Sequence, residues 1–383
     1  MKTQAVSSPH RPGASSDFDA VAAKPYGLRG RLREGLTINP QTVKQWRRFR
    51  SIKRGYYSAV ALVVALVLSA GAELLVNGRA LIVSYDGELY FPTYGDIIPG
   101  DTFGLDYEYE TDYRDLKARF EAQDRGNWVL MPPVPYGPLE NDLTPGYFPP
   151  YAPSFETGHY LGTDQTGRDV LARLIYGFRI AFAFAFLLLL CNYLIGIAVG
   201  CAMGFWGGVF DLLFQRVIEI WNMVPSLYVI MIVASIVIPN FWTLAVVMVI
   251  FGWTQMTWNM RTSTYKEKTR EYVLAARALG ASNTRQIASH VIPNTISVIV
   301  SFIPFSIAGG IFLLTALDYL GFGLPPPTPS WGELLAQGQN HIVTAPWIIL
   351  SVGIAISIVL IMVNYIGEAV REAFDPKKHA YFE

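Results

Sequence analysis

Five long stretches of this chain contain no aspartate, glutamate, lysine or arginine, and this feature constrains its fold more than any other. The stretches are 55–72, 180–210, 220–260, 291–317 and 342–367. A helix needs about 20 mostly apolar residues to cross a bilayer, and the stretch 220–260 is long enough for two crossings with a turn at Pro239-Asn240. The sequence therefore predicts an all-α integral membrane protein with six transmembrane helices. A large soluble protein is the alternative, but several of its core helices would have to be longer than the usual length of about 8 to 20 residues.

The charged residues alternate in sign along the chain. Residues 1–54 contain twelve Lys and Arg against three Asp and Glu, residues 77–178 contain seven against sixteen, and residues 261–290 contain six against two. Because positive charge next to a membrane helix keeps that end in the cytoplasm, we expect cytoplasmic N- and C-termini and an external segment 77–178. The first apolar run begins too late for a cleaved secretory signal, and residues 1–45 have the composition of a disordered basic cytoplasmic tail.

The composition excludes several classes of function. Thirty basic and thirty acidic side chains leave no overall field that would hold a nucleic acid. Cys191 and Cys201 are the only cysteines, and ten residues of helix separate them by about 15 Å, too far for a disulfide. The dipeptide Gly-Lys is absent, and with it the phosphate-binding Walker loop. The apolar stretches also lack the ionisable residues of an ion-coupled carrier, so energy is expected to enter from outside the membrane part.

Glycines and prolines distinguish individual spans. Gly196, Gly200 and Gly204 recur every four residues in the second span, so another helix is expected to pack closely against them. Pro225 in the third span and Pro304 in the fifth each remove a backbone donor, and we expect a kink at both.

The predicted cytoplasmic segment 261–293 contains a short helical hairpin. Gly280 suits the C-terminus of its first helix. Asn283, followed three residues later by Gln286, resembles a capping box that starts a second helix. Ala276 lies four residues before Gly280 on the same helix face, and both are small enough for another protein to close over them. The segment therefore predicts a rigid, exposed docking site.

Two further strings lie on the predicted external side. They are LGTDQTGRDVLARLIYG at 161–177 and LDYLGFGLPPPTPSWGEL at 317–334. The apolar residues at 170, 171, 174 and 175 predict an interfacial helix before the second span. The triple proline predicts a stiff connection after the fifth.

The hairpin resembles the EAA loop of ATP-binding-cassette (ABC) importer permeases. It departs from the general consensus at Leu274, where leucine is nonetheless familiar in peptide permeases, and at His290. The resemblance implies that the loop is a coupling segment seated in an ATPase subunit. Six residues are assigned to this coupling: Leu274, Ala275, Ala276, Arg277, Gly280 and Pro293.

The two external strings are similar to the signatures of the oligopeptide, dipeptide and nickel permeases of this class, which implies the type I importer permease fold. The similarity is carried by Gly162, Asp164, Gly167, Arg168, Asp169, Gly321, Gly323, Trp331 and Gly332. We interpret the charged members as scaffold, and periplasmic docking of a substrate-delivering protein is the alternative role.

A more extensive similarity, to the Yej-type subgroup of peptide permeases, runs from Trp46 nearly to the end. It implies an amphipathic start and first span at 46–76, a periplasmic insertion at 77–160, and a permease core at 161–383 that ends in a cytoplasmic tail. The insertion is rich in Tyr, Phe, Pro and Asp, so we expect an extended, partly strand-forming external cap.

The resemblance implies one half of a heterodimeric importer in a bacterial inner membrane. Such a permease is not an enzyme, has no catalytic, cofactor-binding or metal-binding residues, and moves short peptides, with peptide-like antibiotics as a further cargo. Its implied partners are a homologous permease, ABC ATPase subunits that bind ATP and Mg, a periplasmic peptide-binding protein and membrane lipid. Two alternatives remain: an ABC permease for nickel or another small solute, and a secondary transporter.

Overall fold

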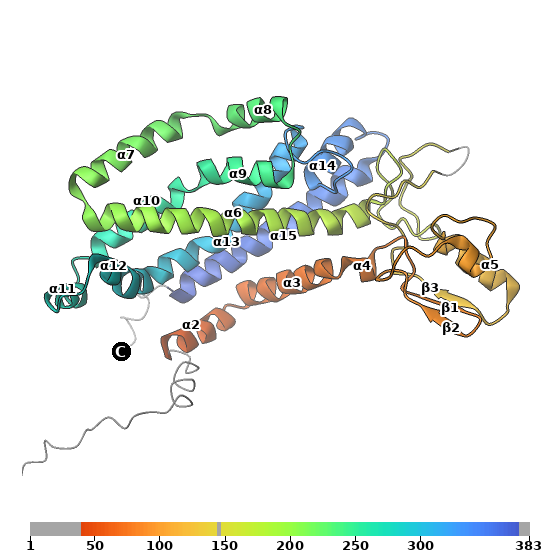
Figure 1. The fold of residues 1–383 in the computed structure, drawn as a ribbon, viewed down its shortest axis with the longest axis horizontal. Coiled ribbons are helices and arrows are strands. Elements are labelled where there is room, and N and C mark those ends of the chain that lie inside the picture. Colours follow the sequence, from red (N-terminus) through yellow and green to blue (C-terminus); the bar gives the residue numbers. More distant parts are fainter. Residues whose placement is uncertain (1–39, 144–146, 375–383) are drawn as a thin grey trace, which may run out of the picture. The chain divides into compact units, whose positions relative to one another are not determined.

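The structure, a computed structural model, describes residues 40–143 and 147–374. Most of the predicted N-terminal tail (1–39) and the C-terminal residues 375–383 lie outside the described residues, whereas residues 40–45 belong to a helix. Five helices are long and apolar enough to cross a membrane, and a bent pair of shorter helices gives a sixth if it is one span. The predicted helical membrane protein is therefore confirmed (Figure 1).

The helices that precede the long spans or connect them are α2 (Pro40–Ser51), α4 (Ala72–Leu75), α5 (Tyr113–Gln123), α11 (Glu271–Ala278), α12 (Asn283–Gln286) and α14 (Trp331–Asn340). The apolar spans are built from α3 (Lys53–Ala70), α6 (Val170–Trp206), α7 (Gly208–Met223), α8 (Ser226–Ile236), α9 (Phe241–Gly252), α10 (Thr254–Glu267), α13 (Ile292–Tyr319) and α15 (Pro346–Phe374).

The long helix α6 includes the residues that we expected to form a separate interfacial helix. Residues 170–175 are its first turns, and the helix continues without interruption for 37 residues. Gly177 lies inside this helix and does not break it. A Cβ at Gly177 would stand 2.8 Å from Trp331 Cδ1, so the glycine allows Trp331 to pack closely against α6. The prediction of an interfacial helix before the second span is therefore wrong.

The glycine stripe of α6 is the contact surface for α10, as predicted. A Cβ at Gly196 would lie 2.7 Å from Met256 Cβ, and one at Gly204 would lie 2.6 Å from the Arg261 carbonyl oxygen. At the middle position, Gly200, it would lie 2.5 Å from the Thr257 carbonyl oxygen. Backbone approach this close is what small residues at four-residue spacing permit between membrane helices.

We expect Gly200→Ala to destabilise the protein by about 1–3 kcal/mol, because the backbone of α10 cannot move away as a flexible side chain would. Gly353→Ala in α15 is the matched control, since a Cβ there meets nothing within 4 Å. Alanine in an open helical position is neutral or slightly stabilising. Thermal unfolding in detergent measures both variants, and equal midpoints would contradict the tight α6–α10 contact.

The third span differs from the prediction. Instead of one kinked helix within 220–238, the chain forms α7 and α8, which meet at a bend of 63°. Pro225 caps α8, and Val224 before it is extended, with φ −74° and ψ 116°. A residue before proline is sterically kept out of the helical region, so the helix stops completely. The turn predicted at Pro239-Asn240 is confirmed, because the Asn240 side chain caps α9 by accepting from the amides of Trp242 and Thr243.

Proline has a smaller effect in the fifth span. Pro304 lies inside α13, which is continuous from Ile292 to Tyr319. The helix packs against α6 where a Cβ on Gly310 would stand 2.8 Å from Ala185, and against α15 where Gly367 meets the Phe305 ring. In turn, α15 packs along α3, with Gly55 against Ala369.

The segment between α4 and α6 contains a small antiparallel sheet with the order β2-β1-β3. Its strands are β1 (Ile82–Tyr85), β2 (Glu88–Tyr90) and β3 (Trp128–Leu130), and Val83 pairs with both Tyr90 and Val129. One apolar core joins the sheet to α5 and to the 3₁₀ turn Gly100–Phe103. Its buried members are Ala80, Val83, Phe103, Leu105, Tyr113, Leu116, Phe120 and Val129.

Candidate functional site

The hairpin predicted between the fourth and fifth spans is formed by α11 and α12, and we call residues 271–286 the α11–α12 hairpin (Figure 1). After α11 the chain turns at Gly280, whose φ is +83°. The Gly280 amide donates to the Arg277 carbonyl and the Ala281 amide to the Ala276 carbonyl, both at 3.0 Å. These two bonds form a Schellman motif, which satisfies carbonyls left free at a helix end. The predicted helix C-terminus is confirmed.

The start of α12 is capped by a different residue from the one predicted. Ser282 Oγ accepts from the Arg285 amide at 3.4 Å, whereas the Gln286 side chain donates to the Ala281 carbonyl at 2.7 Å. Serine and asparagine cap helices about equally well, so the sequence alone could not decide whether Ser282 or Asn283 is the N-cap residue. The predicted capping box at Asn283 is therefore wrong.

The second helix of the hairpin leads into the fifth span without a loop. A single π turn, Ile287–Val291, joins α12 to α13. His290, the unusual residue at the consensus position, lies in this turn. Pro293 follows in the first turn of α13, directly after the π turn. The hairpin is thus a rigid extension of α13.

Most of the α11–α12 hairpin is exposed. Val273 anchors it with 2% exposure, while Leu279 at the tip is 89% exposed and Leu274 is 49% exposed. Nothing lies within 4 Å of the Cβ position at Gly280. Among the other residues assigned to coupling, Ala275, Arg277 and Pro293 are exposed and Ala276 is half-buried. Apolar groups beside small residues on a rigid hairpin form a surface that fits a groove in another protein.

Polar contacts fix the helices just before the hairpin. Asp211 of α7 accepts two hydrogen bonds from the Arg261 guanidinium of α10, both at 2.6 Å, and one from the Tyr265 hydroxyl at 2.9 Å. Lys268 Nζ donates to the Gly204 carbonyl at 2.8 Å, where a positive charge suits the C-terminus of α6. Helices α6, α7 and α10 are therefore held together next to the hairpin.

At the other end of α6, the charged residues of the first external string are buried. Asp164 and Asp169 are 0% exposed and Arg168 is 5% exposed. Arg168 Nε donates to Asp164 Oδ2 at 2.7 Å, and its terminal nitrogen donates to Glu333 of α14 at 3.0 Å. Arg173, fully buried, pairs with the same Glu333. These contacts join the start of α6 to α14, which is the geometry of a scaffold; docking of a periplasmic partner stays a prediction.

Two carboxylates hold a buried histidine beside this cluster. Asp169 caps α6 by accepting from the Ala172 amide at 2.7 Å, and its second oxygen lies 2.9 Å from His159 Nδ1. The other ring nitrogen, Nε2, lies 3.1 Å from Asp142, and the Tyr136 ring stacks on the imidazole at 3.8 Å. Only an imidazolium can donate to both carboxylates at once. His159 thereby connects the end of the insertion to α6.

We expect the stability of this connection to fall as the pH rises. Burial lowers the pKa of His159, but hydrogen bonds and charge attraction from Asp169 and Asp142 outweigh it, so the pKa lies above the ordinary value of 6.5. Because the folded pKa is the higher one, the stabilisation is complete below about pH 6.5 and is lost as the pH rises through the folded value. Proteolysis rates of the insertion measured from pH 6 to 9 test this, and His159→Gln, which cannot titrate, should remove the dependence.

The glycines and the tryptophan of the signatures occupy turns and close contacts. Gly162, Gly167 and Gly321 have positive φ, and Gly323 packs against Asp318. Gly332 lies in a close helix contact, where a Cβ would stand 2.2 Å from the Thr315 carbonyl oxygen. Trp331 is buried and its Nε1 donates to the Leu174 carbonyl at 2.9 Å. Gly332 and Trp331 pack α14 against α13 and α6.

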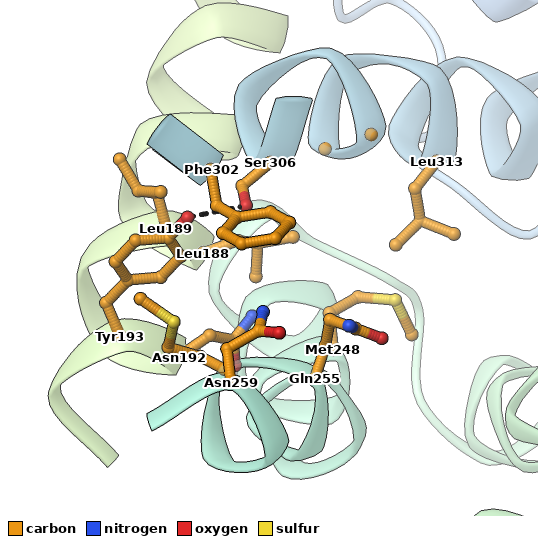
Figure 2. A pocket seen from close by; sticks show the side chains of 14 residues that line it. Leu188, Leu189, Asn192, Tyr193, Met248, Gln255, Asn259, Phe302, Ser306 and Leu313 are labelled. Carbon is orange, nitrogen blue, oxygen red and sulfur yellow. Dashed lines mark hydrogen bonds between the residues drawn. The ribbon is translucent and has the colours of Figure 1, made fainter. Parts of the chain in front are cut away.

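Sequence reasoning missed a cavity among the spans, because it did not consider the uncharged amide side chains there. Figure 2 shows the carboxamides of Asn192, Gln255 and Asn259 grouped on one side of this cavity, with Phe302 and Ser306 across from them. The cavity holds about 200 Å³ and is lined by α6, α9, α10 and α13. Gln255 and Asn259 are four residues apart on one helix face, and this spacing of amides inside an apolar run is the signal that could have located it.

Comparison with known proteins assigns the family. Residues 196–379 match the family described as the binding-protein-dependent transport system inner membrane component. The chain is 40% identical over 343 residues to the inner membrane ABC transporter permease protein YejE of Escherichia coli, covering 89% of this chain and 98% of that protein.

Two further relatives extend this similarity. The peptidoglycan transport system permease protein YejE of Agrobacterium fabrum is 37% identical over 363 residues, covering 89% of this chain and 94% of the relative. The dipeptide transport system permease protein DppC of Haemophilus influenzae is 32% identical over 254 residues, covering 65% of this chain and 85% of the relative. The chain therefore belongs to the family of inner membrane permease components of binding-protein-dependent ABC transporters.

Proposed function

We propose that this chain is the permease subunit of an importer that moves short peptides into the cytoplasm, driven by ATP hydrolysis on separate subunits. The observation that carries the proposal is the 40% identity to an ABC permease along 98% of that relative's length. The relatives include a dipeptide permease and a peptidoglycan transport permease, whose cargoes share a peptide portion. A peptide is therefore the cargo class we assign to this chain.

The α11–α12 hairpin is the part of the chain that we assign to coupling. Its exposed Leu279 and the open face at Gly280 leave room for an ATPase subunit. ATP and Mg would bind to that subunit, and this chain would be neither an enzyme nor a carrier of a cofactor. Both chain termini would then be cytoplasmic, together with the hairpin, and the sheet-containing insertion would face the periplasm.

The other partners follow from the same assignment. A homologous permease subunit would complete the pore, and a periplasmic peptide-binding protein would deliver the cargo to the insertion-bearing end. Alternating access would arise from rigid-body rocking of the two permeases as the ATPase pair closes. The fixed contacts of Asp211 with Arg261 next to the hairpin support such rigid motion.

The test is reconstitution of the complex that co-purifies with the chain in mild detergent. We expect ATP-dependent uptake of a labelled tripeptide into proteoliposomes when loaded binding protein is present, with vanadate-sensitive ATPase activity. A peptide-bearing peptidoglycan fragment and a peptide-like antibiotic, offered in parallel, define the breadth of the cargo class. Uptake driven by an ion gradient without ATP would contradict the proposal in favour of a secondary transporter.

Nickel is the competing cargo. The relatives named for dipeptide and peptidoglycan transport support a peptide instead. Uptake of nickel in place of peptide by the reconstituted complex would overturn the assignment.

A further inference from the structure

The cavity of Figure 2 lies near the middle of the apolar spans that line it. Leu188 is the central residue of α6, which runs from Val170 to Trp206. Gln255 lies within one residue of the centre of the span Phe241–Glu267, and Ser306 lies at the centre of α13. A substrate site near the bilayer midplane is the arrangement that transporters use when one half rocks against another.

Three carboxamides in this cavity lack internal partners. Asn192 Oδ1 is buried and accepts no hydrogen bond from any described residue. The Gln255 and Asn259 side chains likewise make no hydrogen bond within the described part of the chain. By contrast, the hydroxyls of Tyr193 and Ser306 pair with each other at 2.9 Å (Figure 2). A buried acceptor without a hydrogen bond is unfavourable by several kcal/mol, so Asn192 Oδ1 requires a partner from outside the chain. Gln255 is exposed and Asn259 half-buried in this single chain, so both are accessible to the same partner.

The character of the cavity limits what that partner can be. Its lining contains no Asp, Glu, Lys, Arg or His, so it offers no charge to attract an ion or a particular side chain. Each carboxamide can both donate and accept a hydrogen bond, as the amide group of a peptide backbone also does. Apolar walls complete the lining, with Met248, Met256, Phe302 and Leu313 among them. The combination suits a peptide backbone whose side chains vary.

We propose that this cavity is a backbone-binding site on the translocation path, in which Asn192, Gln255 and Asn259 hydrogen-bond to amide groups of the passing peptide. The inference rests on the proposed function and adds the recognition chemistry. Because these hydrogen bonds are made to the peptide backbone and not to side chains, the site accepts peptides that differ in side-chain composition. The competing occupant is a helix of the partner permease, which would satisfy the same carboxamides permanently.

The test uses the complete complex in proteoliposomes and a tripeptide that carries photoreactive leucine at its centre, delivered by its binding protein. Irradiation during ATP turnover is expected to attach the peptide to lining residues such as Met256 or Phe302, which mass spectrometry locates. In the double variant Gln255→Leu/Asn259→Leu, we expect the labelling yield and the peptides transported per ATP hydrolysed to fall about three- to tenfold, the effect of losing one or two neutral hydrogen bonds. Asn364→Leu, an exposed asparagine in α15 outside the cavity, is the matched control that retains both.

The outcomes separate the two proposals. Absence of ATP-driven uptake by the wild-type complex overturns the proposed function itself. Uptake with labelling only outside α6, α9, α10 and α13 overturns the cavity site alone, and so does unchanged labelling in the double variant. Loss of the homologous permease from the purified double variant would show that the carboxamides bind that subunit, which also overturns the inference. If the variant does not fold, the wild-type attachment map still decides.

Discussion

Gly280→Val is expected to insert into the membrane normally, to lose the ATPase subunit during purification and to reduce peptide uptake at least tenfold. A residue with a Cβ at a φ of +83° is unfavourable by roughly 1–2 kcal/mol, and a β-branched one by more. The Schellman bonds of Ala281 and Gly280 would break, and the exposed Leu279 would change direction. Co-purification of the ATPase and uptake by intact cells measure the effect.

Gly87→Val is the matched control for this variant. Gly87 has a φ of +85° and, like Gly280, nothing within 4 Å of its Cβ position, but it lies in the turn between β1 and β2. The same backbone strain there should leave ATPase binding and uptake unchanged. A second variant, Gly280→Asn, distinguishes the effect of backbone strain from the effect of an added side chain. Asparagine tolerates the left-handed conformation, but its side chain still occupies the open face at position 280. Normal uptake by both Gly280 variants would contradict the coupling role of the hairpin.

The features predictable from sequence were those set by local chemistry. Uncharged runs located the spans, four-residue glycine spacing identified the face of α6 that contacts α10, and Gly280 marked the end of α11. Each of these depends on residues within one or two turns of helix. The complete break at Pro225 also has a local cause, the restriction on Val224, but a kinked helix was equally compatible with the sequence.

The features that escaped prediction depend on residues far apart in the chain. Arg173 meets Glu333, which is 160 positions away, and no periodicity connects them. The cavity has the same origin, because Asn192 and Gln255 come from different helices and are brought together only by the packing of α6 on α10. The sequence could therefore indicate that Asp164, Arg168 and Asp169 matter without identifying their partners, and uncharged amides were not considered at all.

The helix α10 connects the two parts of the chain that we assign to transport. It carries Gln255 and Asn259 in the cavity and Arg261 nearer the hairpin, and Lys268 follows its last residue. Packing against the glycine stripe of α6 holds it along its whole length. A displacement of the α11–α12 hairpin by an ATPase would therefore be transmitted to the cavity by α10, which three residues separate from the hairpin, and by α13, which continues from it. This is the physical reason to expect cargo binding and ATP hydrolysis to be coupled.

The largest loss of stability is expected from Arg173→Met, at about 3–5 kcal/mol. The guanidinium is fully buried, pairs with Glu333 and donates to the carbonyls of Pro327 and Thr328, each at 3.3 Å. Without it, Glu333 keeps the bonds from Arg168 and from the neutral Gln337 amide, and a carboxylate that is 14% exposed loses one of its two positive partners. Thermal unfolding in detergent and the amount of protein in membranes measure the effect.

A matched control for Arg173 exists on the same helix. Arg179 pairs with Glu73 at 2.8 Å, but their side chains are 37% and 36% exposed. Arg179→Met should therefore change stability by at most about 1 kcal/mol, because water replaces the lost partner. If the loss at Arg173 comes from the carboxylate left behind, then Arg173→Met/Glu333→Gln should recover part of it. Equal effects of Arg173→Met and Arg179→Met would show that α6 and α14 are held together by apolar contacts such as Trp331, and that the buried ion pairs contribute little to the scaffold.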